Sequence, residues 1–307
     1  MSETFTWIGF NLLIFILLIF DLNVFNRKKH EIQTREAILL SLFWIALSLL
    51  FNLFVYFTKG PVAGLQFFTG YLIEKSLSVD NIFVFVVLFK YFQVAKMYQH
   101  KVLYWGILGA LVMRITLILT GITLIERFHW FIYVLGGFLI ISGIKLLFQK
   151  EKEQQPEKNF VVKLFKKFFP VTDAYHEEKF FVRIDGRLFA TPLFIVLLVI
   201  ETTDVVFALD SIPAIFAITT DPFIIYSSNV FAILGLRSLY FVLEKFVDQF
   251  RYLGTGLALI LIFIGCKMLI AGYYPIPILF SLGMIVAILT ISVLASLYAT
   301  AKEKKPH

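Results

Sequence analysis

Nine long apolar segments follow one another along the chain, and short polar stretches separate most of them. Each segment is long enough to cross a hydrocarbon core of about 30 Å as a helix. The pattern therefore predicts an all-α, polytopic transmembrane helical bundle of about nine spans, with no separate soluble domain. The spans lie near residues 5–25, 36–57, 63–89, 102–121, 130–148, 190–217, 226–244, 254–272 and 277–300.

Two of these spans carry acidic residues in their interiors. The third span has Glu74 and, six residues later, Asp80, followed by Asn81. The sixth span repeats this spacing with Asp204, Asp210 and then Ser211, and Glu201 precedes them by one helical turn. Ionised groups inside a bilayer are costly and rare, so they indicate a transport or relay site.

The segments that follow the two acidic motifs also match. Each motif is followed by an arginine in the next span, Arg114 or Arg237, and then by a Gly-x-Lys sequence that ends at Lys145 or Lys267. Each unit has three spans, so the second unit starts from the opposite side of the membrane. The sequence therefore predicts an inverted repeat of spans 3–5 and 6–8, an architecture in which transporters place their sites near the midplane.

The chain divides into five regions by this pattern. We expect two N-terminal spans in 1–62, the first repeat in 63–149, a cytoplasmic loop in 150–189, the second repeat in 190–273, and the ninth span with a basic tail in 274–307. The loop contains an amphipathic stretch at 160–169, typical of a helix at the membrane interface. An Asp-Gly pair at 185–186 between two short β-prone runs predicts a small hairpin.

Composition and charge agree with a membrane protein and add an orientation. Hydrophobic residues make up 59% of the 307 residues, and the mean hydropathy is +0.85. With the N-terminus outside and the C-terminus in the cytoplasm, the inner loops and tail hold 21 of the 28 Lys and Arg residues and the outer side only Lys59 and Arg127. This distribution follows the positive-inside rule. The net charge of +7 then faces the anionic cytoplasmic leaflet, and it gives no reason to expect nucleic acid as a partner.

The polar groups inside the spans define the candidate chemistry. All five histidines lie in loops or the tail, and the chain has a single cysteine, Cys266. Carboxylates, amides, hydroxyls and carbonyls remain, and these oxygen ligands suit the hard divalent cations Mg²⁺, Ca²⁺ and Mn²⁺. The candidate metal ligands are Glu74, Asp80, Asn81, Glu201, Asp204, Asp210 and Ser211.

Four further residues enter the predicted site. Arg114 and Arg237 are candidate counter-charges that pair with the aspartates when no metal is bound, and protons are candidates for the same exchange. Pro213 follows Asp210 closely and is expected to kink its helix, freeing the carbonyl of Leu209 as a further oxygen ligand. Asp21, near the inner end of the first span, belongs either to the site or simply to the interface.

Several sequence stretches together carry a resemblance to the TerC family, and within it to the bacterial Alx-type membrane proteins. The stretches are 70–75 with 80–81, 201–216, 219–223 and 229–237, and the resemblance covers nearly the whole chain. It implies a bacterial inner-membrane protein linked to manganese export and metal homeostasis, in a family named for tellurite resistance. It also implies that the functional acids are Asp21, Glu74, Asp80, Glu201, Asp204 and Asp210.

These observations predict a secondary transporter that exports Mn²⁺ as its substrate, with proton entry as a candidate coupling. One alternative is export of another hard divalent cation such as Ca²⁺; another is a non-transporting factor that assists metal loading or membrane-protein assembly. An intramembrane aspartyl protease is the enzymatic alternative, but its Tyr-Asp and Gly-x-Gly-Asp motifs are absent around Asp80 and Asp210. We therefore expect no enzyme and no resident cofactor, and the residues predict no oligomeric state.

Overall fold

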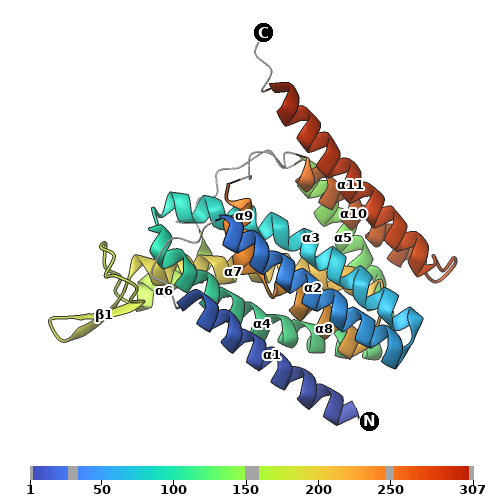
Figure 1. Cartoon of the computed structure of the whole chain (residues 1–307), viewed down its shortest axis with the longest axis horizontal. Helices are drawn as coiled ribbons and strands as arrows, with labels where there is room; N and C mark the ends of the chain where they lie inside the picture. Colours follow the sequence, from blue (N-terminus) through green and yellow to red (C-terminus); the bar gives the residue numbers. More distant parts are fainter. Residues whose placement is uncertain (1–2, 27–33, 149–158, 246–251, 304–307) are drawn as a thin grey trace.

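The computed structural model describes residues 3–26, 34–148, 159–245 and 252–303. The chain is almost entirely helical, with one small hairpin (Figure 1). The elements are α1 (Glu3–Asn26), α2 (Thr34–Lys59), α3 (Pro61–Tyr91), α4 (Lys96–Arg127), α5 (Phe131–Phe148), α6 (Phe160–Phe168), β1 (Phe181–Ile184), β2 (Arg187–Ala190), α7 (Pro192–Phe216), α8 (Pro222–Ile233), α9 (Leu236–Leu243), α10 (Leu253–Ile270) and α11 (Ile278–Glu303).

The predicted all-α, polytopic class is confirmed. Each predicted span coincides with a helix, except the seventh, which coincides with the pair α8 and α9. Among the described residues six helices are long and apolar enough to cross a membrane, and the bent pair would make a seventh. The apolar part of α1 is shorter than a full span, and α3 carries charges in its middle. The count of nine spans and the inverted repeat stay predictions.

The seventh predicted span is broken in its middle, which the apolar pattern did not reveal. Helix α8 starts with Asp221 as its N-cap and ends at Ile233, and α9 continues at an angle of 41° to it. Gly235 at the break has a φ of +78°, in the left-handed region that favours glycine. A Cβ atom there would lie 2.6 Å from the Trp44 side chain of α2. The break therefore depends on glycine at 235, because only glycine combines this backbone angle with the close approach of Trp44.

Pro213 lies within an uninterrupted helix, and the kink expected there stays a prediction. Helix α7 runs to Phe216 and includes Pro213 in its last turn. Proline has no N–H group to donate to the carbonyl of Leu209, four residues earlier. The helix nevertheless continues for three residues beyond Pro213 before it ends. The structure therefore places the irregular backbone of the bundle interior in α8 and α9 rather than at Asp210.

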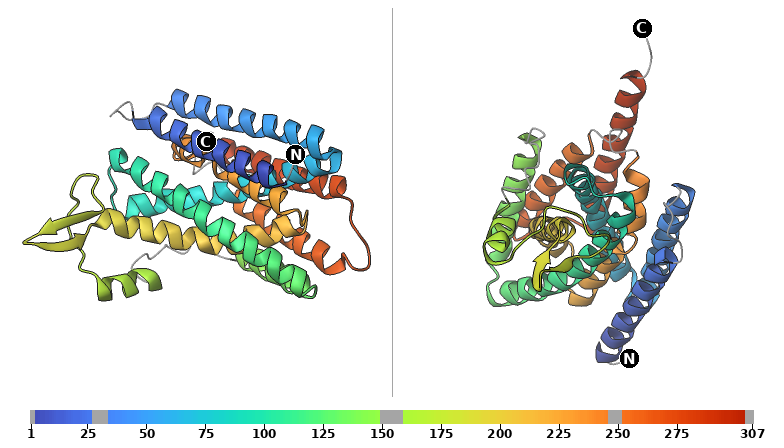
Figure 2. Two further views of the ribbon diagram at one scale, coloured as in Figure 1. Left: turned by 90° about the horizontal axis from the view of Figure 1, so that it is seen from below. Right: turned by 90° about the vertical axis from the view of Figure 1, so that its left-hand side faces the viewer.

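The loops gather at two opposite ends of the bundle. At one end the hairpin and its flanking segment lie over the turn between α3 and α4, where Tyr175 donates a hydrogen bond to the Phe92 carbonyl at 2.6 Å (Figures 1 and 2). At the other end Lys59 of α2 forms an ion pair with Asp221 at 2.9 Å. The predicted amphipathic helix and hairpin are both present, as α6 and β1–β2.

Helix α3 occupies the centre of this arrangement and positions the acidic motif. It contacts α2, α7, α8 and α9, so the motif faces other helices on several sides. Neighbouring helices supply partners for two charged side chains of α3: Glu74 pairs with Arg114 of α4, and Lys75 donates to the carbonyl of Ala232 in α8.

Helices α5 and α10 pack through a reciprocal pair of glycines. A Cβ atom at Gly143 would lie 2.7 Å from the carbonyl oxygen of Ala258, seven residues before Gly265. A Cβ atom at Gly265 would lie 2.6 Å from the carbonyl oxygen of Gly136, seven residues before Gly143. Small residues let membrane helices approach closely. The contact is reciprocal, since each glycine lies against a carbonyl oxygen of the other helix.

We expect Gly143→Val to separate α5 from α10, because the new side chain meets backbone atoms that cannot rotate away. Overpacking of this kind costs about 1–3 kcal/mol, so the purified protein should unfold at a lower temperature in detergent. Gly137→Val is the matched control, since Gly137 lies in the same helix with nothing within 4 Å of an added Cβ. Equal melting temperatures for the two variants would contradict this packing.

Candidate functional site

Arg114 of α4 joins acids from both halves of the chain. Its guanidinium forms an ion pair with Glu74 of α3 and a two-pronged contact with Asp204 of α7, through Nε to Oδ2 at 3.3 Å and Nη2 to Oδ1 at 3.1 Å. Asn229 of α8 closes the network by donating to Glu74 Oε2 at 3.1 Å and accepting from Arg114 Nη1 at 3.4 Å. The network thus connects four helices.

All four side chains of this network are buried. Glu74 is 0% exposed, Asn229 1%, Arg114 2% and Asp204 5%. A buried charge is tolerated only when it is paired and hydrogen-bonded. The two carboxylates formally outnumber the single guanidinium, so the network carries a net negative charge that a further cation would neutralise. Arg–carboxylate forks also fix geometry, and this one fixes α4 relative to α7.

Helices α3 and α7 are antiparallel neighbours (Figure 1). Two contacts fix the alignment: Gly70 lies against Ile215, and Phe85 and Ile200 line the same cavity. This alignment puts Glu74 level with Ser211. In the same way Asn81 lies level with Asp204, and one face of each helix carries the groups of the two motifs.

Several oxygen atoms on these two helices are buried without a hydrogen-bond partner. They are Ser78 Oγ, Asn81 Oδ1, Glu201 Oε2, Asp210 Oδ1 and Ser211 Oγ. Buried polar groups are ordinarily hydrogen-bonded, and an unpaired one costs about 1–3 kcal/mol. All five are oxygens that can coordinate a hard cation or bind water. Their concentration on α3 and α7 marks the space between and beside these helices as polar.

Glu201 and Asp210 lie outside the Arg114 network. The Glu201 carboxylate lies against Gly109 of α4, where an added Cβ would be 2.0 Å from its Oε1. Asp210 faces α5, where its carboxyl interacts with the Ser142 hydroxyl and with the charge of Lys145. The acids of α7 are therefore spread along the helix, with Asp204 at the network, Glu201 about one turn to one side and Asp210 about two turns to the other.

Asp21 and Arg237 form a second buried ion pair, separate from the first. Arg237 Nη2 donates to Asp21 Oδ2 at 2.7 Å and to the Asp21 carbonyl at 2.6 Å, which joins α1 to the start of α9. Both residues are buried. The structure therefore pairs Asp21 with a charge instead of leaving it at an interface, and it places Arg237 away from Glu74 and Asp204.

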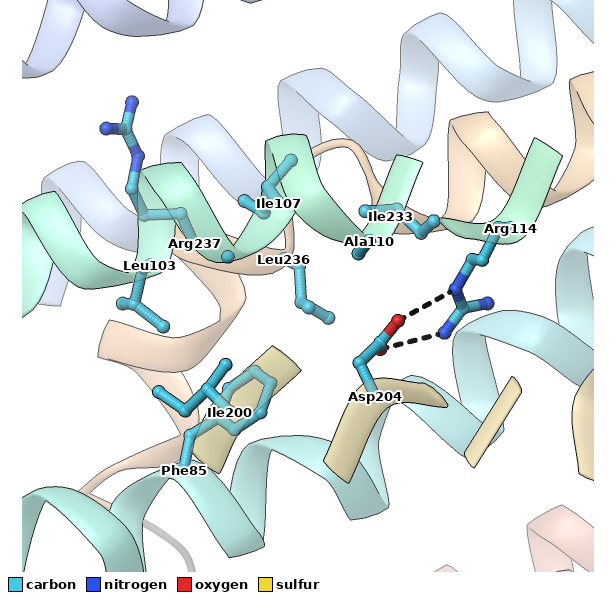
Figure 3. A pocket seen from close by; sticks show the side chains of 11 residues that line it. Phe85, Leu103, Ile107, Ala110, Arg114, Ile200, Asp204, Ile233, Leu236 and Arg237 are labelled. Atoms are coloured by element: carbon cyan, nitrogen blue, oxygen red, sulfur yellow. Dashed lines mark hydrogen bonds and ion pairs between the residues drawn. The ribbon is translucent and has the colours of Figure 1, made fainter. Parts of the chain in front are cut away.

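A small, mostly apolar cavity of about 20 Å³ lies beside the Arg114–Asp204 contact. Arg237 lines it at one end, and Arg114 with Asp204 lines it at the other (Figure 3). Between them the walls come from α3, α4, α7 and the α8–α9 pair, with the side chains Phe85, Leu103, Ile107, Ile200, Ile233 and Leu236.

The predicted metal ligands do not all meet in the described structure. Among the side chains that the structure describes, no group of three or more His, Cys, Asp or Glu residues could hold a metal ion. Asp80 lies in α3, but its side chain is outside the described part, so its position in the site stays a prediction. Glu74 and Asp204 come together through Arg114, with Asn81 and Ser211 on the same faces of α3 and α7.

Two residues of the site did not figure among the predicted ligands. Asn229 bridges Glu74 and Arg114, and Gly109 makes room for Glu201. Asn229 could have been found from the sequence, because it is an amide in the middle of an apolar span and such polar side chains face the bundle interior. Gly109 carries no comparable signal, since a glycine in a membrane helix has many structural uses.

Comparison with known proteins places this architecture in a family. A profile described as "Integral membrane protein TerC family" matches residues 59–304. A relative from Myxococcus xanthus, "Uncharacterized membrane protein STKORF319", is 50% identical over 95% of this chain and 91% of its own. Proteins named "Putative membrane-bound redox modulator Alx" from Salmonella typhi and Escherichia coli (strain K12) are 45% and 44% identical, each over 97% of this chain and 96% of their own.

No solved structure matches the chain. The family profile covers most of the sequence, and the relatives align over nearly their entire length. The chain belongs to the TerC family of integral membrane proteins.

Proposed function

We propose that this protein is a secondary transporter that exports a hard divalent cation, Mn²⁺ before others, from the cytoplasm across the bacterial inner membrane. The observation that carries the proposal is the Arg114 network, in which one buried cation holds Glu74 of α3 and Asp204 of α7. An excess of carboxylates at membrane depth attracts cations, and intramembrane acids of this kind mark ion pathways.

In this proposal Arg114 is the cation that holds the acids together when the substrate is absent. An entering Mn²⁺ competes with the guanidinium for Glu74 and Asp204, and the unpartnered oxygens of Asn81, Ser211 and Glu201 on α3 and α7 are the proposed further ligands. We include Asp80 and Asp210 as ligands at the same site or at a second position along the path. Protons are the proposed counter-ions, because carboxylates released by the metal can accept them.

The proposed path starts at the cytoplasmic end, with the N-terminus outside and the C-terminus inside. The α3–α4 turn and the hairpin lie at the end that carries most of the basic residues, which supports its assignment to the cytoplasm.

The name of the Alx relatives mentions redox modulation, and a metal exporter can account for such an effect. The chain has one cysteine, so it cannot form an intramolecular disulfide. We therefore propose that any influence on cellular redox state arises through the exported metal. Ca²⁺ is the alternative substrate of the same chemistry, since oxygen ligands accept it as well.

Neutralising the acids that Arg114 holds should stop transport. We expect Glu74→Gln and Asp204→Asn each to reduce Mn²⁺ flux into proteoliposomes at least about tenfold, because one lost ligand interaction of about 1.4 kcal/mol already has this effect. Glu126→Gln, at an exposed position near the end of α4, is the control and should keep its flux. Normal flux in both network variants would rule out this site.

The same proteoliposomes separate the proposed transporter from an accessory factor. An accessory protein that assists metal loading or membrane-protein assembly would not move ions alone. Liposomes that contain the wild-type protein should release trapped Mn²⁺ faster than liposomes without protein. Competition of Ca²⁺ and Mg²⁺ with Mn²⁺ for this flux ranks the substrates. Absence of flux with any divalent cation, at several imposed pH gradients, would exclude the transport proposal.

Removing the guanidinium of Arg114 should increase the stabilisation of the protein by Mn²⁺. Arg114→Gln leaves two buried carboxylates unpaired, which costs about 3–5 kcal/mol, so its melting temperature should fall. Mn²⁺ no longer competes with a guanidinium in this variant and should raise its melting temperature more than that of wild type. A variant that Mn²⁺ does not stabilise would show that Glu74 and Asp204 are not metal ligands.

A further inference from the structure

The C-terminus of α8 ends inside the bundle, and a lysine from another helix covers it. Helix α8 stops at Ile233, two residues before the bend at Gly235. Lys75 of α3 extends its ammonium to this end and donates hydrogen bonds to the carbonyl of Ala232 at 3.1 Å and to that of Leu234 at 3.5 Å. The last carbonyls of a helix lack intrahelical partners and carry the negative end of its dipole.

Lys75 belongs to neither of the two buried ion pairs. It follows Glu74 in the sequence, but consecutive residues of a helix point about 100° apart, so the two side chains leave α3 in different directions. Among the described residues Lys75 forms no ion pair, and both of its hydrogen bonds go to main-chain oxygens of the α8–α9 segment. A cation at membrane depth needs compensation, and here the compensation comes from carbonyl dipoles.

Carbonyls at the end of a broken helix are the ligands with which transporters bind a coupling cation. Here the same ligands surround an ammonium group that is covalently part of the chain. We propose that the α8 C-terminus forms a site for a monovalent cation, Na⁺ or K⁺, and that Lys75 fills this site permanently as a tethered cation.

The proposal explains two features of the break together. The carbonyls exposed by the left-handed Gly235 receive a charge-assisted donor, and the break remains held without a dissolved ion. Lys75 also links the break to α3, the helix that carries Glu74, while Asn229 makes a second link from α8 to Glu74. The position of the α8 terminus is therefore fixed relative to the acidic network from two directions.

Shortening the side chain should open the site to a dissolved ion. We expect Lys75→Ala to melt at a lower temperature than wild type when choline is the only monovalent cation. Na⁺ or K⁺ at constant ionic strength should then raise its melting temperature by about 5 °C in a saturable manner. Wild type should respond equally to the three salts. A chelator in every sample removes divalent metals, so the result does not depend on the proposed transport function.

Three matched variants make the test specific. Lys75→Arg keeps the tethered charge and should show no salt specificity. Lys75→Met keeps the length of the side chain, blocks the space for an ion, and should be destabilised in all salts. Lys267→Ala removes another buried lysine, one with no hydrogen bond to a helix-end carbonyl in the described structure, and should gain no response to Na⁺ or K⁺.

The comparison of Na⁺ and K⁺ with choline decides the proposal. If Lys75→Ala is destabilised alike in all three salts, or is as stable as wild type in choline, the lysine does not occupy a cation site and the proposal is overturned. If Lys75→Ala cannot be purified, its melting temperature is measured in membrane vesicles in the same three salts. Failure of the variant to fold in every salt also contradicts the proposal. A further expectation, which rests on the proposed function, is that Mn²⁺ transport by Lys75→Ala requires the stabilising ion.

Discussion

The pairing of Arg114 with Glu74 and Asp204 is the interaction on which the interior of this protein depends. It joins the first half of the chain to the second, and all three side chains are buried from water. Because an unpaired charge there would be far costlier than a broken surface ion pair, the three residues constrain one another and the helices that carry them. Asn229 extends this constraint to α8.

The broken helix gives the same region its second constraint. Gly235 supplies a backbone angle that other residues rarely adopt, and Lys75 binds the carbonyls that the break exposes. Irregular backbone within a membrane is tolerated where protein groups satisfy it. Two consecutive residues of α3 thus hold the two features: Glu74 belongs to the acidic network, and Lys75 binds the end of α8.

Two sets of interactions in the bundle differ in how readily they can rearrange. The glycine contact between α5 and α10 is tight and apolar, and it has little room for movement. The polar faces of α3 and α7, in contrast, retain buried oxygens without partners. Packed cores resist gradual deformation, whereas polar groups can exchange partners. We therefore regard α5 and α10 as a stable support beside a more adaptable α3–α7 interface.

The sequence by itself determined the class of this protein, because apolar segments of spanning length have few alternatives and intramembrane acids are conspicuous among them. It also indicated the hairpin, through the Asp185-Gly186 turn, and an arginine such as Arg114 as a partner of the intramembrane aspartates. Only the tertiary structure decided that Arg237 pairs with Asp21, that Asp210 faces α5, and that the seventh predicted span breaks at Gly235. The physical reason is that helical spacing fixes which residues share a face, while the partner of each face depends on how the helices pack.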